Sequence, residues 1–184
     1  MSQTQTKSQL MSGSEVDRSL VRLAHEIIEK TPSSQQLVVV GIHRRGAVLG
    51  ERLAEKLKDV AGHEIPFGSL DITLYKDDLT TVSHHPVHNA TDIVFSVDGK
   101  LVLLVDDVLY TGRTTVAALR ALLDHGRPGA VRLCVLIDRG HRELPIEADY
   151  VDRRVETEDE EIVEVKVESI DGDERVLLVE KVAG

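Results

Sequence analysis

The sequence predicts an α/β fold built on a central, mainly parallel sheet that is flanked by helices. Residues 37–58 and 101–125 each contain an apolar strand, a short turn and a helical pattern, and a third apolar run follows at 131–137. Strands that helices cover on both faces are near-continuous runs of aliphatic residues, whereas half-exposed strands alternate. The three apolar runs therefore predict neighbouring parallel strands joined by right-handed helical crossovers.

A polar tail and a helix are expected ahead of the first strand. Residues 1–12 are polar and low in hydrophobicity, which predicts disorder. Ser14, with Asp17 three residues later, resembles a capping box, and apolar residues then recur at helical spacing until Pro32. Residues 13–184 contain no internal repeat and no Pro- or Ser-rich linker, so we expect them to form a single domain.

A long polar segment separates the first two strand–helix units. Residues 67–74 alternate in part and predict a strand, and residues 93–97 predict a returning strand. Long loops of this kind inside a compact domain often act as lids. The segment holds clustered histidines without an accompanying cysteine or carboxylate frame, so a surface loop is favoured over a metal site. These histidines are His84, His85 and His88.

The second helix of the repeated unit and the C-terminal strands are predicted from the same patterns. Apolar residues recur at helical spacing from Val116 and predict a helix that ends near Gly126. Alternation at 162–170 and at 176–179, on either side of a turn that contains Gly172, predicts a C-terminal hairpin.

Composition and charge disfavour several classes of protein. The net charge of −10 disfavours a nonspecific binder of nucleic acid or anionic membranes, but it leaves room for a local basic patch. The one cysteine, Cys134, lies in an apolar run, so we expect a buried, unreactive thiol. No stretch reaches the ~20 apolar residues of a membrane span, and the N-terminus lacks the apolar segment of a signal peptide. A cytoplasmic location is the resulting expectation.

Two adjacent carboxylates mark the end of the second apolar strand. The stretch LVLLVDDVLYTGRTT at 101–115 places Asp106 and Asp107 directly after the apolar run. Buried carboxylates are costly to desolvate, so this pair is expected to face a cleft with a partner. The turn at 110–114 then opens a helix, whose N-terminal N–H groups favour anions. The stretch therefore predicts an anion-binding cup beside two acids that hold sugar hydroxyls or a divalent cation, as a phosphorylated sugar requires.

Charged turns follow the other two strands at the same edge of the predicted sheet. GIHRRG at 41–46 is a basic turn between glycines, of the kind that binds phosphate, and another charged turn occupies 138–145. Ligands of α/β sheets bind at the carboxyl ends of the strands, where these turns are expected to meet. A single basic turn is weak evidence, but its coexistence with the acid pair favours a phosphate-binding site.

The sequence lacks the motifs of two common phosphate-binding folds and resembles a third. Neither G-x-x-x-x-G-K-[ST] nor G-x-G-x-x-G occurs, which argues against a P-loop nucleotidase and a dinucleotide-binding fold. VLLVDDVLYTGRT at 102–114 instead resembles the phosphoribosyl-pyrophosphate signature of type I phosphoribosyltransferases. GIHRRG at 41–46 resembles the pyrophosphate loop of one subfamily, DITLYKDDL at 71–79 resembles its flexible hood, and residues 135–151 are close to its hallmark.

The resemblance implies a type I phosphoribosyltransferase fold with a flexible hood and a C-terminal hairpin. It implies that the protein converts uracil and phosphoribosyl pyrophosphate into UMP and pyrophosphate, with Mg²⁺ as cofactor. It also implies that UMP-favoured binding to pyrimidine-operon leader RNA lowers expression, and that the protein is a homodimer or higher homo-oligomer with no membrane association. Two alternatives stay open: an RNA-binding, nucleotide-sensing regulator with little turnover, and a transferase that acts on a purine base.

The resemblance also assigns roles to individual residues. Asp106 and Asp107 are implied to hold the ribose hydroxyls, directly or through the water shell of Mg²⁺, and to act in catalysis together with Arg45. The residues implied to bind substrate are Arg44, Arg45, Gly46, Tyr75, Lys76, Asp77, Asp106, Asp107, Val108, Leu109, Tyr110, Thr111, Gly112, Arg113, Thr114, Ile137, Asp138, Arg139 and Val163.

RNA binding is implied for a basic face that departs here from the family pattern. The residues implied to contact RNA are Arg22, His25, Arg142 and Arg153. Glu147 stands where the family usually has arginine, and seven acids and one lysine occupy residues 156–168. Because carboxylates repel RNA phosphates, we hypothesise that RNA affinity is reduced or that a different surface is used.

Overall fold

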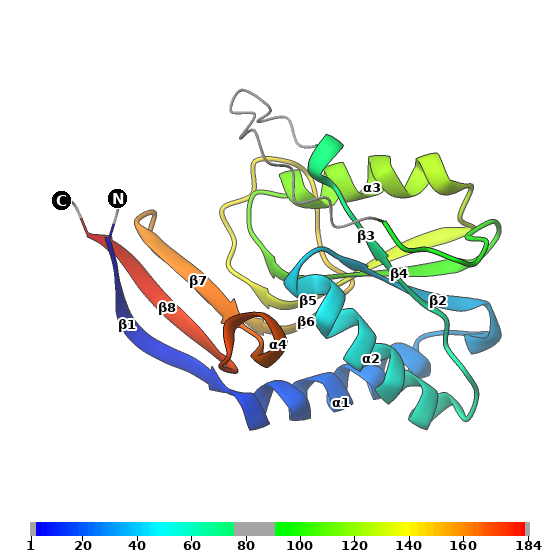
Figure 1. The fold of residues 1–184 in the computed structure, drawn as a ribbon, viewed down its shortest axis with the longest axis horizontal. Coiled ribbons are helices and arrows are strands. Elements are labelled where there is room, and N and C mark those ends of the chain that lie inside the picture. Colours follow the sequence, from blue (N-terminus) through cyan, green and yellow to red (C-terminus); the bar gives the residue numbers. More distant parts are fainter. Residues whose placement is uncertain (1–2, 76–90, 183–184) are drawn as a thin grey trace.

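The computed structural model describes residues 3–75 and 91–182, whose strands form two separate sheets (Figure 1). The elements follow in the order β1 (Gln3–Ser12), α1 (Gly13–Glu29), β2 (Leu37–Ile42), α2 (Arg45–Ala61), β3 (Phe67–Leu70), β4 (Leu101–Leu109), α3 (Arg113–His125), β5 (Ala130–Asp138), β6 (Tyr150–Arg154), β7 (Glu161–Lys166), α4 (Glu168–Asp171) and β8 (Arg175–Val182). In this part of the chain, no helix combines the length and the apolar character needed to cross a membrane.

The larger sheet is parallel and contains the three strands predicted from their apolar runs. Its order is β3-β2-β4-β5-β6, and every neighbouring pair runs parallel. Leu104 in the centre lies opposite Val40 on one side and Leu133 on the other. The predicted α/β architecture with a parallel sheet is therefore confirmed. The sequence did not predict β6, which extends the sheet at one edge.

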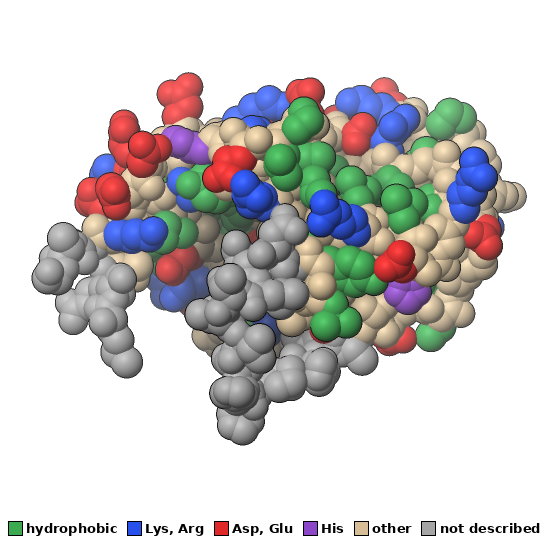
Figure 2. All heavy atoms as spheres, turned by 90° about the horizontal axis from the view of Figure 1, so that it is seen from above, with side chains coloured by type: hydrophobic (Ala, Val, Ile, Leu, Met, Phe, Trp, Pro, Cys, Tyr) green, Lys and Arg blue, Asp and Glu red, His purple; other side chains and the backbone are tan. Residues whose placement is uncertain are grey.

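Helices cover both faces of this sheet, which is why its strands are runs of aliphatic residues. α1 and α2 pack against one face, where the core includes Val39 and Leu103. α3 packs against the other face, where the core includes Val38 and Leu104. Neighbouring residues of one strand thus enter opposite core layers. Seen from the α3 side (Figure 2), hydrophobic side chains interrupt the charged surface, and α3 itself contributes the exposed Leu123.

The smaller sheet is antiparallel and joins the two ends of the described chain. Its order is β1-β8-β7, and β7 pairs with β8 in the antiparallel manner predicted for the C-terminal hairpin. The short helix α4 and Gly172, at φ 65°, connect these two strands. β7 also contacts β4, so the smaller sheet lies beside the larger one (Figure 1).

The prediction that residues 1–12 are disordered is wrong for residues 3–12, which form β1. Their backbone groups pair with those of β8, with two irregularities in register. Met11 is fully buried, and Lys7 donates to the Glu161 carboxylate at 2.5 Å. Polar residues are tolerated because an antiparallel edge strand can leave one face in water, so low hydrophobicity alone did not indicate disorder here.

The N-cap of the first helix lies two residues earlier than predicted. Ser12, not Ser14, is the N-cap of α1. The Ser12 backbone N–H donates to the Glu15 carboxylate at 2.7 Å, and the Glu15 N–H donates to the Ser12 hydroxyl at 3.4 Å, which completes a capping box. Asp17 instead forms an ion pair with Lys56 of α2 at 3.2 Å.

Two strand predictions around the polar segment were inaccurate. The strand expected at 67–74 ends at Leu70, and Thr73–Tyr75 form a short 3-10 helix. Residues 93–97 form no strand; their alternation reflects the side chains of Ile93, Phe95 and Val97, which pack into the core layer under α3 without a backbone ladder. The histidines and hood residues that lie outside the described residues are Lys76, Asp77, His84, His85 and His88.

Candidate active site

Three turns meet at the carboxyl ends of β2, β4 and β5, as the parallel topology requires. Gly46 lies against the end of β4, because a Cβ at this position would be 2.7 Å from the Val105 carbonyl oxygen. Arg142, in the turn after β5, donates from Nη1 to the Tyr110 carbonyl oxygen at 2.8 Å. The turn after β5 therefore contacts the turn after β4, and the turn after β2 contacts the end of β4 itself.

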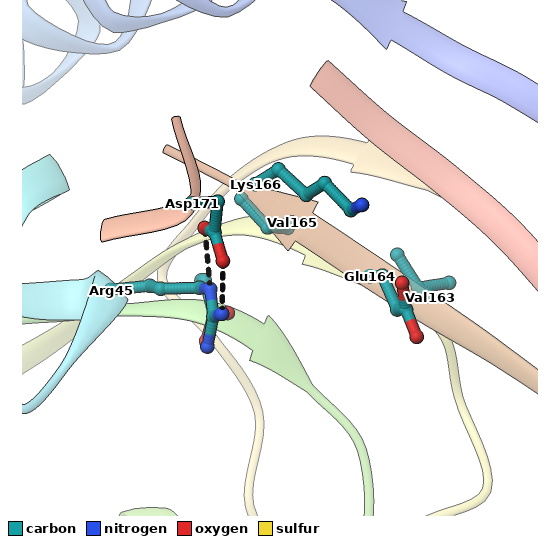
Figure 3. A pocket seen from close by; sticks show the side chains of 7 residues that line it. Arg45, Val163, Glu164, Val165, Lys166 and Asp171 are labelled. Atoms are coloured by element: carbon teal, nitrogen blue, oxygen red, sulfur yellow. Dashed lines mark hydrogen bonds and ion pairs between the residues drawn. The ribbon is translucent and has the colours of Figure 1, made fainter. Parts of the chain in front are cut away.

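A cavity of about 430 Å³ opens between the turn after β2 and strand β7 (Figure 3). The lining residues that belong to the predicted site are Arg45, Asp107 and Val163. The lining residues that sequence reasoning missed are Glu164, Val165, Lys166 and Asp171. All four lie on β7 or α4. Val163 was the one residue in this part of the chain that the sequence predicted to belong to the site. The structure thus brings the end of β4 and the smaller sheet to a common cavity.

A two-point ion pair holds the Arg45 guanidinium in this cavity. Arg45 Nε donates to Asp171 Oδ2 at 3.1 Å, and Nη2 donates to Asp171 Oδ1 at 2.6 Å (Figure 3). Asp171 Oδ2 also accepts from the Val167 backbone N–H at 2.8 Å. Hydrogen bonding by Arg45 lowers the pKa of the Asp171 carboxyl, and hydrogen bonding to Asp171 raises the pKa of the Arg45 guanidinium. Both groups are therefore charged at neutral pH.

The two adjacent acids at the end of β4 have different surroundings. Asp106 is 8% exposed, and its Oδ1 accepts from the Asp107 backbone N–H at 2.9 Å. Asp107 is half-buried and lines the cavity beside Arg45. Within residues 3–75 and 91–182, no three His, Cys, Asp or Glu side chains form a metal-binding group. Mg²⁺ commonly uses one or two carboxylates together with water and substrate phosphates, so this pair of oxygen donors fits Mg²⁺.

The turn after β4 leads into the N-terminus of α3. Gly112 caps the helix at φ 90°, in the left-handed region that favours glycine. A Cβ there would lie 3.1 Å from the Ile146 side chain. The Thr111 hydroxyl accepts from the Arg113 N–H at 3.3 Å, and the Thr111 carbonyl accepts from the Glu143 N–H at 2.9 Å. The turn after β5 therefore braces this turn, and the first N–H groups of α3 provide a site that attracts anions.

Arg139 is a buried cation in the turn after β5. It is 5% exposed, its guanidinium lies 3.9 Å from the centroid of the Tyr110 ring, and its Nε donates to the Thr157 hydroxyl at 3.2 Å. Its Nη2 is buried and has no hydrogen-bond partner in the described part of the chain. Leaving a buried cationic nitrogen without an acceptor costs free energy, so an acceptor on a ligand would be stabilising at this position.

Some predicted site residues place their side chains away from the cavity. Ile137 and Leu109 are buried in the two core layers. The Tyr75 hydroxyl donates to Asp124 of α3 at 2.5 Å. Arg44 is the N-cap of α2 and is exposed. These residues surround the turns, but the structure does not bring their side chains together with Asp107 and Arg45 as lining residues of the cavity.

Most of the side chains expected to contact RNA are engaged by other groups of the protein. Arg22 donates to the Asp152 carboxylate at 2.9 Å, and Arg153 donates to a backbone carbonyl oxygen of β1 at 2.5 Å. Arg142 donates within the site, as described above, whereas His25 is exposed. The arginines are therefore already paired on the surface that the sequence predicted as basic.

Comparisons with known proteins identify the family. A family model for the phosphoribosyl transferase domain matches residues 8–171. The chain is 56% identical to bifunctional protein PyrR of Pelotomaculum thermopropionicum, over 95% of this chain and 96% of that protein, and 53% identical to bifunctional protein PyrR of Thermus aquaticus, over 95% and 97%. A solved hypoxanthine-guanine phosphoribosyltransferase from Bacillus anthracis is similar in fold with a TM-score of 0.70 at 18% identity, over 96% of this chain and 99% of that one. The chain therefore belongs to the phosphoribosyltransferase family and has the fold of its type I members.

Proposed function

We propose that the protein is a uracil phosphoribosyltransferase, which converts uracil and phosphoribosyl pyrophosphate into UMP and pyrophosphate. We propose as its second role that it lowers expression of pyrimidine operons by UMP-dependent binding to leader RNA. The observation that carries the enzymatic proposal is the position of Asp106 and Asp107 between an arginine turn and a helix N-terminus. This arrangement suits a ribose that carries an anionic group on each side.

The proposed reaction requires orientation and charge stabilisation, not a nucleophilic side chain. The bond between C1′ and the pyrophosphate oxygen breaks, a bond between C1′ and N1 of uracil forms, and the proton of N1 is taken up by the departing pyrophosphate. Positive charge develops on the ribose as the leaving group departs. The carboxylates of Asp106 and Asp107 hold the ribose hydroxyls and stabilise this charge, and the surrounding turns align the two substrates.

The two anionic groups of the donor are assigned to two different turns. The 5′-phosphate is held by N–H groups and hydroxyls between Tyr110 and Thr114, at the N-terminus of α3. Pyrophosphate lies toward Arg44, Arg45 and Gly46. Mg²⁺, when bound, neutralises charge on the leaving group, and Asp106 and Asp107 would hold it directly or through water. Tyr75, Lys76 and Asp77 are proposed to contribute to donor binding, a role that rests on the resemblance to the family, since Lys76 and Asp77 lie outside the described residues.

Uracil is placed against the turn after β5. The buried Nη2 of Arg139, which has no acceptor among the described residues, supports this position, because a carbonyl oxygen of the base would satisfy it. Val163 lines the cavity from β7 and provides an apolar contact. A site built to hydrogen-bond particular edges of a base rejects bases that lack them.

The regulatory role is proposed for the surface near Arg22, His25, Arg142 and Arg153. The ion pairs and hydrogen bonds of the three arginines, together with the exposed Glu147, support reduced RNA affinity compared with an unpaired basic face. We also propose a homodimer or higher homo-oligomer, which rests on the resemblance to the family. Analytical ultracentrifugation of the purified protein tests this last point.

Pyrophosphate release tests the enzymatic proposal. The protein is assayed with phosphoribosyl pyrophosphate, Mg²⁺ and, in parallel reactions, uracil, hypoxanthine, guanine or adenine. We expect release with uracil, and UMP as the chromatographic product. Release with a purine base alone would show a purine transferase, and absence of turnover with any base would show a nucleotide-sensing regulator; either result would overturn the proposal.

A further inference from the structure

We propose that Asp171 is a positioning residue for the pyrophosphate side of the site. Its carboxylate holds the Arg45 guanidinium so that the remaining N–H groups of that guanidinium meet the pyrophosphate of the donor. This inference rests on the transferase function proposed above. Asp171 lies in the segment between β7 and β8, far from the three turns in the sequence, and the sequence itself assigned it no role.

The geometry of the ion pair leaves one edge of the guanidinium available. Nε and Nη2 of Arg45 both donate to Asp171, at 3.1 and 2.6 Å, and a two-point contact of this kind fixes the plane of the guanidinium. Nη1 makes no hydrogen bond to any residue within 3–75 or 91–182. The Arg45 side chain is 36% exposed and the Asp171 side chain 16%. The carboxylate is therefore shielded, while the cation stays accessible to an anion in the cavity.

Charge alone does not explain a carboxylate at this position. The cavity carries two cations, Arg45 and Lys166, against the carboxylates of Asp107, Glu164 and Asp171. Pyrophosphate is strongly anionic, so an uncompensated carboxylate beside it would be repulsive. Asp171 is compensated by Arg45, and any benefit to donor binding must come from orienting that cation.

One further contact holds Asp171 itself, and another holds the segment that carries it. Its Oδ2 accepts from the Val167 N–H, at the start of α4. Arg52, which is seven residues after Arg45 and hence on the same face of α2, pairs with Glu174. The segment that carries Asp171 is thus fixed to α2 at a second point, so the Arg45–Asp171 contact joins two held elements.

The substitution Asp171→Asn separates orientation from charge, because the two effects have opposite signs. Removing a negative charge from an anion site strengthens pyrophosphate binding, whereas releasing Arg45 weakens it by restoring the freedom that binding must then remove. We expect the Kd for pyrophosphate with Mg²⁺, measured by calorimetry, and the KM for phosphoribosyl pyrophosphate to rise about tenfold. The KM for uracil is expected to change much less.

Glu174→Gln is the matched control, since it weakens the neighbouring contact between α2 and the segment that follows α4 without touching Arg45. It should leave the Kd for pyrophosphate unchanged. In an Arg45→Ala background, Asp171→Asn should no longer weaken pyrophosphate binding and should instead tighten it, because only the removal of an uncompensated negative charge remains. Unchanged or tighter binding by Asp171→Asn, or an equal loss in Glu174→Gln, would overturn the proposal.

Calorimetry needs no turnover, so the two proposals fail differently. Weakened pyrophosphate binding by Asp171→Asn in a protein that forms no UMP would support the role of Asp171 and overturn the transferase function. If the unaltered protein forms UMP and Asp171→Asn binds pyrophosphate equally well, the transferase function would be supported and the role of Asp171 overturned. A protein that binds no pyrophosphate at all would overturn both.

Discussion

Gly46 and Asp106 are in backbone contact: a Cβ at position 46 would lie 3.0 Å from Asp106 Cα and 3.2 Å from Asp106 Oδ1. The same Cβ would be 2.7 Å from the Val105 carbonyl oxygen. These atoms belong to β4, which is paired on both sides in the parallel sheet, so they cannot give way as the tip of a long side chain would. The turn proposed to bind pyrophosphate and the proposed catalytic acids therefore share one rigid contact.

Gly46→Ala is expected to lower kcat/KM for UMP formation about 100-fold, because even a small displacement of catalytic groups has an effect of that size. It should also lower the free energy of unfolding by about 1–3 kcal/mol through overpacking. Gly99→Ala is the control, since φ at Gly99 is 66° and no atom lies within 4 Å of its Cβ position. The control should lose stability but retain kcat/KM. Full activity in Gly46→Ala, measured by initial rates, would contradict the contact.

Asp107→Asn and Asp106→Asn are each expected to reduce kcat for UMP formation by about 10²–10³-fold, the loss typical when a group that stabilises transition-state charge is removed. Asp107 faces the cavity, so its variant should also need more Mg²⁺ for half-maximal rate. Initial rates over a series of Mg²⁺ concentrations measure both effects. Glu164→Gln removes a charge from the same cavity on β7 instead of β4, and an equal loss there would argue against specific roles for the two aspartates.

Arg142 is expected to support catalysis even though the sequence placed it on an RNA-binding face. Its guanidinium donates to the Tyr110 carbonyl, the Ile146 carbonyl and the Asp138 carboxylate, each at 2.8 Å. Lysine cannot make these three hydrogen bonds at once. For Arg142→Lys we therefore expect higher KM values for both substrates, and a loss of about 1–3 kcal/mol in unfolding free energy from the groups left unpaired. Kinetics and denaturation measure the two effects. Arg154→Lys, at an exposed neighbouring position, should change neither.

The strands that could be predicted are those whose burial is evident from their own residues. β2 and β4 are covered on both faces, so each is a run of aliphatic residues that no exposed segment would contain. β1 is polar because it is an edge strand, and its order depends on β8 at the other end of the chain. Ile93, Phe95 and Val97 alternate like a strand, yet packing under α3 produces the same pattern without pairing.

The residues of the candidate site likewise divide into those that a local motif predicts and those that depend on distant parts of the chain. Asp106, Asp107 and the turn to Thr114 form one contiguous motif, and their neighbours follow from parallel topology. Asp171 lies outside any motif, and its partner Arg45 is 126 residues away in the sequence. A contact between a helix start and a turn of the other sheet depends on how the two sheets pack, which local patterns do not encode.

The Arg45–Asp171 pair predicts a pH dependence of stability. Hydrogen bonding lowers the folded-state pKa of Asp171 below its ordinary value of 3.8, so the pair stabilises the fold above that pH. The contribution is lost as the pH falls from 3.8 through the lower folded-state pKa. We expect Asp171→Asn to reduce the unfolding free energy by roughly 0.5–1 kcal/mol at pH 7, and the difference from the unaltered protein to vanish in stronger acid. Denaturant titrations at pH 7 and in stronger acid measure this difference in unfolding free energy. A difference that persists in acid would contradict the stabilising ion pair between Arg45 and Asp171.

Glu147→Arg is expected to strengthen binding of pyrimidine-operon leader RNA about tenfold, because it replaces a repulsion of RNA phosphates by an attraction. Glu147 is exposed, whereas Arg22 and Arg153 of the predicted RNA face already donate to other groups of the protein. One added phosphate contact should steepen the dependence of log K on log salt by about 0.7–0.9. Titration of a leader hairpin at several salt concentrations, with and without UMP, measures both quantities.

The control for this prediction is Glu55→Arg, which makes the same change of charge at an exposed position on α2. It should alter RNA affinity far less, because only a local contact gives a full increment in salt dependence. Equal strengthening by both variants would show a general effect of net charge, which is −10 in the unaltered protein. Tight, UMP-enhanced binding by the unaltered protein at physiological salt would contradict reduced affinity directly, since the paired arginines and Glu147 would then not oppose RNA binding.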